Sequence, residues 1–264
     1  MEYEALIVER SDSTVTVTLN RPEKRNAMNG RMLDEFDHLF TELKMDPDTR
    51  FVIFTGAGTA FSGGADLIGL GSGQGNVSPH HSMRLQQMAG HDFIRKLESL
   101  EQVTIAAVNG VCLGAGFVVA HGCDFIIASQ NARFGIPEAN VGLFYTWGCT
   151  PRLARIVGPS KAKEMIMTCE NVDAEEALRI GLVCKVVPPD MLMTAAHEMV
   201  DKISARAPVA VRMAKKIVNA STAANIGDIY VCEPELVERL SYGEDLMEGM
   251  RAFAEKRRPR FTGK

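Results

Sequence analysis

The sequence predicts an α/β fold in which strands and helices alternate along the chain. Short apolar segments of strand composition, such as RFVIFTG at 50–56 and DFIIAS at 124–129, are separated by segments whose apolar residues recur at helical spacing. Repeated alternation of this kind favours parallel pairing of the strands. Beyond residue 189 the pattern is almost wholly helical. We therefore expect a core over 1–200 followed by a helical C-terminal region over 201–264.

The N-terminal elements are a hairpin and a helix. Residues 5–10 and 14–20 flank the turn sequence Ser11-Asp12-Ser13, which predicts a β-hairpin. A helix is expected after Asn26, because apolar side chains recur at helical spacing, at Leu33, Phe36, Leu39, Phe40 and Leu43. Pro47-Asp48 ends this helix before the strand at 50–56.

The remaining elements follow from the same criteria. In chain order they are a Gly- and Ser-rich loop at 56–79, a helix at 82–100, a strand at 104–108, the turn Asn109-Gly110, a helix at 114–121, a strand at 124–129 and a short strand at 182–187.

Composition limits the class of protein. The chain has 264 residues, which suits one large domain with or without an appendage, and a formal charge of −4, which recruits neither nucleic acid nor an anionic membrane. Its apolar runs are shorter than the roughly 20 residues that span a bilayer, and MEYEALIVER carries acids where a secretory signal carries bases. The scattered cysteines form no CxxC pair and share no ligand spacing with the histidines. We expect reduced thiols, a cytoplasmic location and no metal site.

Two glycine-containing turns, called the glycine corners below, have the same physical features. In AFSGGADL (60–67) a Ser-Gly-Gly run follows a strand region, and in NGVCLGAGFVVA (109–120) Gly114-Ala115-Gly116 opens a helix. Glycine permits positive φ and close backbone approach, and the first turn of a helix offers unpaired N–H groups. The two corners could direct two N–H groups at one oxygen, as in an oxyanion hole. The alternative is that the glycines only permit tight turns and helix packing.

Several motifs in order resemble the crotonase family, the enoyl-CoA hydratase/isomerase superfamily. The resemblance covers nearly the whole chain and is carried by TLNRPEKRNAMN (18–29), GAGTAFSGGADL (56–67), VNGVCLGAGFVVAHGCDFIIAS (108–129), ARFGIPEANVGL (132–143), RLARIVG (152–158), AEEALRIGLVCKVV (174–187) and FAEKRRPRF (253–261). It implies a spiral of ββα units with a helical C-terminal trimerisation region, assembled as a trimer or hexamer. The implied substrate is an acyl-CoA, with coenzyme A as its carrier part and no separate cofactor.

The resemblance also implies roles for particular residues. Ala65 and Ala115 would present the two oxyanion-hole N–H groups to the thioester carbonyl. The coenzyme A portion would be held by residues from three segments: Lys24, Arg25 and Ala27; Gly63, Gly64, Asp66 and Leu67; and Phe253 and Lys256. For Lys256 with Arg257 and Arg258, a solvated basic tail is the alternative.

The chain departs from the family's hydratases at one catalytic position. Those enzymes use two glutamates; Glu138 matches one of them, and Val118 stands at the other. Valine cannot transfer a proton, whereas a single buried carboxylate suffices to move a proton between carbons α and γ to a thioester. This favours a Δ3–Δ2 enoyl-CoA isomerase slightly over a hydratase.

A second departure follows Glu138 closely. The chain has Tyr145-Thr146-Trp147 where many members have a Gly-rich turn, and Thr146 replaces the aspartate of several hydrolases, ring isomerases and dehalogenases. We expect Tyr145 and Trp147, with Val118, to line the acyl pocket, where Tyr145 could also orient water. His80 and His81 could act as bases, although a solvated loop position is the commoner outcome for histidines.

Other functions remain open at this point. A hydrolase or C–C lyase on a cyclic or branched acyl-CoA would need Tyr145 or a loop histidine to supply the missing group. A non-catalytic CoA-binding member is a further alternative.

Overall fold

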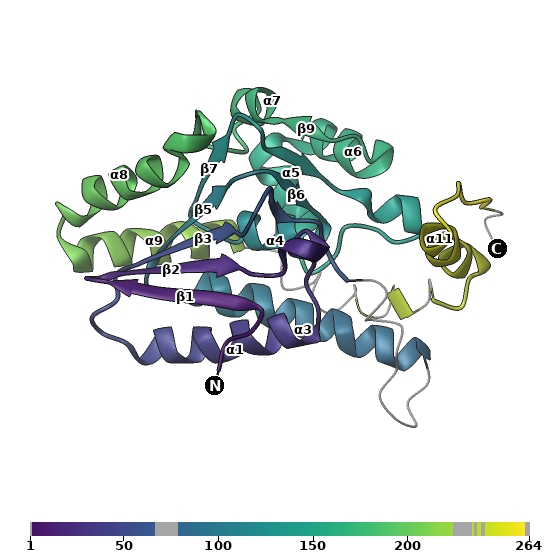
Figure 1. Cartoon of the computed structure of the whole chain (residues 1–264), viewed down its shortest axis with the longest axis horizontal. Coiled ribbons are helices and arrows are strands. Elements are labelled where there is room, and N and C mark those ends of the chain that lie inside the picture. Colours follow the sequence, from purple (N-terminus) through teal and green to yellow (C-terminus); the bar gives the residue numbers. More distant parts are fainter. Residues whose placement is uncertain (1, 67–78, 224–233, 235–236, 239–240, 262–264) are drawn as a thin grey trace.

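The computed structural model describes residues 2–66, 79–223, 234, 237–238 and 241–261. Its main sheet has six strands in the order β1-β2-β3-β5-β7-β10 (Figure 1). The hairpin strands β1 (Leu6–Ser11) and β2 (Thr14–Leu19) are antiparallel. The other strands pair in parallel: β3 (Phe51–Gly56), β5 (Val103–Val108), β7 (Phe125–Ser129) and β10 (Lys185–Val187). The predicted α/β class with a parallel sheet is confirmed.

A second, smaller sheet lies beside the first, in the order β4-β6-β8-β9. Its strands are β4 (Ala60–Ser62), β6 (Val111–Leu113), β8 (Arg133–Gly135) and β9 (Val172–Asp173). β3 is followed by β4, β5 by β6 and β7 by β8. In each pair the first strand belongs to the main sheet and the second to the smaller sheet, and this pair repeats along the chain. Helices α3 (Pro79–Ser99) and α4 (Gly114–His121) complete the first two units, which gives the expected ββα repeat.

The main sheet is buried on both faces. Alternate residues of each strand point to opposite faces. Thus Val52 and Phe54 join the larger apolar cluster with α1 (Gly30–Met45) and α3, which lie together below the sheet in Figure 1. Ile53 and its neighbours Ile105 and Ile127 face the other way, into a cluster covered by α8 (Leu192–Ser204).

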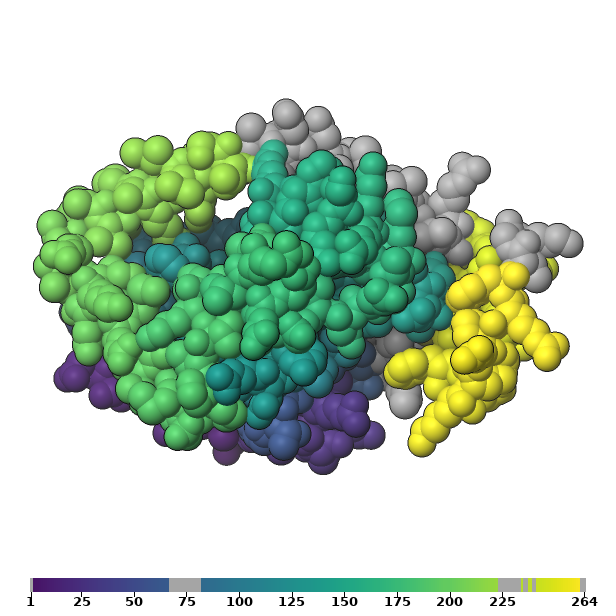
Figure 2. Space-filling model, turned by 90° about the horizontal axis from the view of Figure 1, so that it is seen from above, coloured from purple at the N-terminus to yellow at the C-terminus, as the bar shows by residue number. Residues whose placement is uncertain are grey.

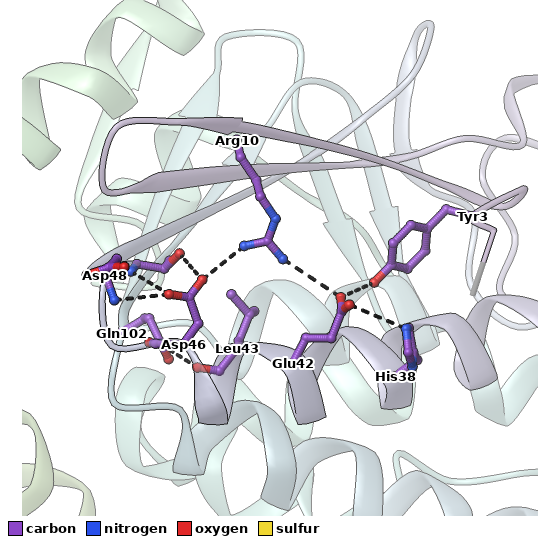
Figure 3. Close-up of polar contacts among 9 residues, drawn as sticks. Tyr3, Arg10, His38, Glu42, Leu43, Asp46, Asp48 and Gln102 are labelled. Carbon is purple, nitrogen blue, oxygen red and sulfur yellow. Dashed lines mark hydrogen bonds and ion pairs between the residues drawn. The ribbon is translucent and has the colours of Figure 1, made fainter.

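Polar contacts tie the N-terminal hairpin to α1 (Figure 3). Arg10 pairs with Asp46 at 3.1 Å and Glu42 at 3.8 Å, and the Tyr3 hydroxyl donates to Glu42 at 2.8 Å. Asp46 also accepts from the backbone N–H of Asp48. These contacts are partly exposed and lie on the hairpin side of the molecule, so they serve the fold.

Further helices complete the described part of the chain. They are α5 (Cys149–Val157), α6 (Pro159–Thr168), α7 (Ala174–Arg179), α9 (Pro208–Ala223) and α11 (Glu244–Ala254), with short 3₁₀ helices η1 (Pro22–Lys24), η2 (Pro137–Val141) and η3 (Pro189–Met191). α9 and α11 lie at opposite ends of the longest axis in Figures 1 and 2. α8 spans the expected boundary near residue 200, and the division into two units stays a prediction.

Three sequence-based boundaries differ from the structure. The first helix begins at Gly30 rather than after Asn26, because Asn29 caps it by accepting from the N–H of Met32. The expected loop at 56–79 contains β4, and its residues 67–78 lie outside the described part. The strand expected at 182–187 is confined to 185–187. Within the described ranges, no helix combines the length and apolar character needed to cross a bilayer.

Candidate functional site

The two glycine corners lie against each other. Gly64 adopts a φ of +104°. A Cβ placed on it would lie 3.2 Å from the carbonyl oxygen of Leu113, just before α4. Gly64 therefore permits both the backbone turn and the close approach of the two chain segments. The structure thus brings the segments of Ala65 and Ala115 together, as the sequence predicts.

The N–H of Ala65 points away from its neighbouring chain segment. Residue 65 forms an isolated parallel bridge with Met28. In this bridge the N–H of Met28 donates to Gly64 O and the N–H of Asp66 donates to Met28 O, each at 2.8 Å. Successive N–H groups of an extended segment face opposite sides. The N–H of Ala65 is therefore directed to the side away from Met28.

Ala115 offers the second N–H. It is the second residue of α4, and the residue before the helix, Leu113, contributes no side-chain cap. N–H groups in the first turn have no acceptor within the helix and carry its partial positive charge. Two such donors facing one site could bind an anionic oxygen.

Glu138 lies at the start of α4 as well, although it comes from η2. A Cβ on Gly114, whose φ is +47°, would lie 2.8 Å from Glu138 Oε1. Part of Glu138 is accessible to solvent, but its Oε2 atom is buried and has no hydrogen-bond partner among the described residues. Burial raises the pKa of the Glu138 carboxyl to about 7, partly offset by a hydrogen bond from its own backbone N–H. The group can therefore both accept and donate a proton near neutral pH.

The expected pocket residues Val118 and Tyr145 are both buried. Val118 is 3% exposed and follows Ala115 by about one helical turn, on the same face of α4. The Tyr145 ring stacks on Phe117, with centroids 6.0 Å apart. Burial raises the pKa of Tyr145 well above its usual value, with smaller contributions from Cys149 and Glu138. The Tyr145 hydroxyl therefore keeps its proton.

Trp147 packs against α3. Its backbone has a φ of +57°, and its ring lies 6.1 Å from that of Phe93. A Cβ on Gly90 would come within 2.1 Å of the indole, so the ring rests directly on the helix backbone. Only glycine at position 90 allows this ring placement.

The residues expected to hold coenzyme A fall into two groups. Residues 24–27 and 63–66 form one, since the N–H of Gly63 donates to Arg25 O at 2.7 Å, and the Lys24 and Arg25 residues are exposed. Asp66 in this group forms an ion pair with Arg21 at 2.9 Å, which occupies its carboxylate within the protein. Leu67 lies outside the described residues.

Phe253 and Lys256 form the second group, at the end of α11. Phe253 is 56% exposed, and Lys256 is exposed with a φ of +53°. α11 packs against the element that carries Glu138: a Cβ on Gly249 would meet Val141 at 2.6 Å. Their contact with coenzyme A stays a prediction.

The histidines divide by position. His91 and His121 are buried. Burial, with a smaller contribution from Arg152, lowers the pKa of His121 to about 3. The side chains of His80 and His81 lie outside the described part. In the described ranges, no cluster of His, Cys, Asp and Glu is suited to hold a metal ion.

Sequence reasoning missed the polar framework behind the site. The buried Asn26 side chain donates to Ala57 O and Ala60 O and accepts from the N–H of Arg21. Ser62 Oγ donates to Asn26 O and accepts from the N–H of Gly64. The sequence instead predicts a helix start after Asn26, because a polar residue before an apolar periodic segment is the usual capping signal.

Comparison with known proteins places these features in a family. The model of the enoyl-CoA hydratase/isomerase family matches residues 9–264. The chain is 41% identical over 259 residues to the short-chain-enoyl-CoA hydratase of Clostridium acetobutylicum, covering 98% of this chain and 97% of that protein. It is 36% identical to the crotonyl-CoA hydratase of Syntrophomonas wolfei, over 100% of both chains.

The solved structures agree. The crystal structure of an enoyl-CoA hydratase from Mycobacterium avium subsp. paratuberculosis matches with a TM-score of 0.87 at 27% identity, covering 99% of this chain and 100% of that one. The expected crotonase-like fold is thereby confirmed. The names of the relatives favour hydratase and give no support to the expected preference for isomerase.

Proposed function

The chain belongs to the enoyl-CoA hydratase/isomerase family, and on that premise we propose that it acts on enoyl-CoA through a thioester enolate. In this proposal the N–H groups of Ala65 and Ala115 bind the enolate oxygen. Glu138 moves the proton. The single observation that carries the proposal is the buried carboxylate of Glu138 against Gly114, at the same helix start that presents Ala115.

The electrostatics suit proton transfer at a carbon acid. A proton α to a thioester is weakly acidic, so its removal needs stabilisation of the enolate as well as a base. Two preorganised N–H donors supply that stabilisation, and removing one donor from such a site typically costs about 3 to 4 kcal/mol. A carboxyl whose pKa is about 7 is ionised in half of the molecules at neutral pH and can return the proton after accepting it.

Isomerisation is the reaction that needs only these groups. Glu138 would remove a proton from C2 of a 3-enoyl-CoA and return it to C4, which moves the double bond to C2–C3. Val118, at the position of the family hydratases' second glutamate, is 3% exposed and cannot take part in proton transfer. Hydration is the second candidate, and the names of the relatives support it.

Coenzyme A binding is proposed at the segments that the resemblance indicates. Residues 24–27 and 63–66 would hold the adenosine and pantetheine portions, and the exposed Lys24 and Arg25 are available to phosphate groups. Phe253 and Lys256 would approach the adenine and phosphates. Asp66 would contribute through its ion pair with Arg21, which fixes the loop.

A homo-oligomer is also proposed, as a trimer or hexamer. One side of α9 is anchored: Lys215 donates to Asp124 and to Gln102 O, each at 2.7 Å. Its apolar side chains remain exposed, with Ile217 at 70% and Val209 at 61%. A contiguous apolar helix face of this kind is typical of a subunit interface. An Ile217→Asp variant should therefore sediment as a smaller species than the parent protein, and unchanged sedimentation would contradict this use of α9.

The reaction can be identified with three substrates. We would incubate the protein with 3-enoyl-CoA, 2-enoyl-CoA and saturated acyl-CoA, following enoyl absorbance and thiol release. We expect the parent protein to convert 3-enoyl-CoA and 2-enoyl-CoA. In Glu138→Gln, turnover of both should fall by about 100-fold or more. Glu170→Gln, which removes one exposed carboxylate elsewhere, is the control. Unchanged turnover in Glu138→Gln would exclude Glu138 as the acid–base group, and thiol release from saturated acyl-CoA would indicate a hydrolase.

A further inference from the structure

Two buried polar atoms near the proposed reaction centre receive no hydrogen bond. Among the described residues, Glu138 Oε2 has no partner, and no group donates to the Tyr145 oxygen, whose own proton is directed at the Cys149 thiol; both atoms are shielded from solvent. Buried polar groups are paired in the great majority of cases, and an unpaired one needs an explanation. Two acceptors without donors suit one small molecule that donates two hydrogen bonds, such as water, held between them.

Both groups adjoin the same stripe of α4. Glu138 Oε1 lies against Gly114, and the Tyr145 ring stacks on Phe117 at 6.0 Å. Residues three and four apart lie on one face of a helix, so Gly114, Phe117 and Val118 form that stripe. The charge on Glu138 also contributes to the raised pKa of Tyr145, which places the two groups within electrostatic reach of each other.

We infer that Glu138 Oε2 and the Tyr145 hydroxyl together hold the water molecule that adds to C3 of a 2-enoyl-CoA. Tyr145 is then a positioning residue. It binds the water in place of the family hydratases' second glutamate, because Val118, at that glutamate's position, cannot form a hydrogen bond. The inference rests on the proposed function, because it requires a thioester bound at Ala65 and Ala115. It gives the site a route to hydration as well as to isomerisation.

The atoms balance without any further reactant. Water donates one hydrogen to Glu138 Oε2 and the other to the Tyr145 oxygen, which leaves a lone pair directed at C3. As the new O–C3 bond forms, one water proton passes to Glu138 and the C2–C3 π electrons move onto the thioester oxygen. The protonated Glu138 then gives its proton to C2, which yields a 3-hydroxyacyl-CoA. Tyr145 keeps its own proton throughout.

His121 is another buried group near α4 whose ring nitrogens have no partner among the described residues, and it is less suited to this role. Both of its ring nitrogens are unpaired in the described structure, and its ring lies 5.6 Å from Phe117. It follows Ala115 by six residues, about 9 Å along the helix axis at 1.5 Å per residue. The thioester carbonyl at Ala115 is therefore far from His121, whereas C3 of the substrate lies only two bonds from that carbonyl carbon.

Tyr145→Phe tests the inference because it keeps the stacked ring and removes only the hydroxyl. We expect kcat for hydration of 2-enoyl-CoA to fall about 10- to 100-fold, with KM little changed. Isomerisation of 3-enoyl-CoA should stay within about twofold, because it uses no water. Tyr3→Phe is the matched control: its hydroxyl donates to Glu42 on α1, beside the N-terminal hairpin (Figure 3), and neither reaction should change.

A second variant separates positioning from packing. Adding Val118→Glu to Tyr145→Phe should restore hydration, because it returns a water-holding carboxylate to the stripe. Hydration at the parent rate in Tyr145→Phe would overturn the inference, as would equal losses of hydration and isomerisation. A double variant that isomerises normally but recovers no hydration would also count against it. If the parent protein converts neither substrate, the proposed function itself is wrong.

Discussion

Gly114→Ala should damage the catalytic centre more than it damages the fold. Gly114 has a φ of +47°, where an L-residue with a Cβ is strained. Its added Cβ would lie 2.8 Å from Glu138 Oε1, whereas ordinary contacts of a Cβ begin at 3.4 Å. The carboxylate must therefore move away or the helix start must shift.

The size of the effect follows from these two terms. Strain at a positive φ costs roughly 1–2 kcal/mol of stability. To restore a contact of 3.4 Å from one of 2.8 Å, the carboxylate must move by about 0.6 Å. A 1 Å misplacement can lower a rate by about 100-fold, so we expect kcat to fall by about 10-fold or more. The expected signature is a moderate loss of stability with a larger loss of turnover.

Gly181→Ala provides the matched control. Gly181 has a φ of +76°, and an added Cβ would meet nothing within 4 Å. Urea unfolding should show similar losses for both variants, while enoyl-CoA turnover should fall only in Gly114→Ala. Equal kcat values for the two variants would refute the close contact between position 114 and the catalytic carboxylate.

Two further predictions concern the Glu138 carboxyl and the Trp147 side chain. Because the folded pKa of Glu138 is about 7 and its unfolded value is 4.5, its contribution to stability is full below pH 4.5 and is lost as pH rises through 7. Urea unfolding of the parent protein should thus lose about 3 kcal/mol relative to Glu138→Gln between these pH values; parallel pH profiles would exclude the raised pKa. Trp147→Ala should shift kcat/KM towards longer acyl chains by about 10-fold or more, because the indole fills space beside Gly90 and Phe93. Unaltered chain-length preference would show that Trp147 does not line the acyl pocket.

The sequence predicted the parts of the fold that have strong local signals. The apolar period of Phe36, Leu39 and Leu43 identifies a helix, and the alternation in Thr14–Leu19 identifies a strand. The second sheet was not predicted from these patterns, because Ala60–Ser62, Val111–Leu113 and Arg133–Gly135 are each three residues long. Such segments become strands only through long-range pairing.

The site was predicted in part, for a similar reason. Glycine-rich corners indicate exposed N–H groups, and the resemblance to the family assigns these groups to Ala65 and Ala115. The contact between Gly114 and Glu138 joins residues 24 positions apart, and no local pattern encodes it. The support of Trp147 by Gly90 is equally invisible in sequence, since an isolated glycine in a helix usually signals only a weaker helix.

Hydrogen exchange at the acyl α-carbon tests the central claim most directly. In D₂O, the parent protein should introduce deuterium at C2 of a saturated acyl-CoA, because enolate formation needs no double bond. Glu138→Gln should bind the same ligand with similar affinity, and its exchange should be at least about 100-fold slower. Exchange at the parent rate in Glu138→Gln would contradict the assignment of Glu138 as the group that moves the proton.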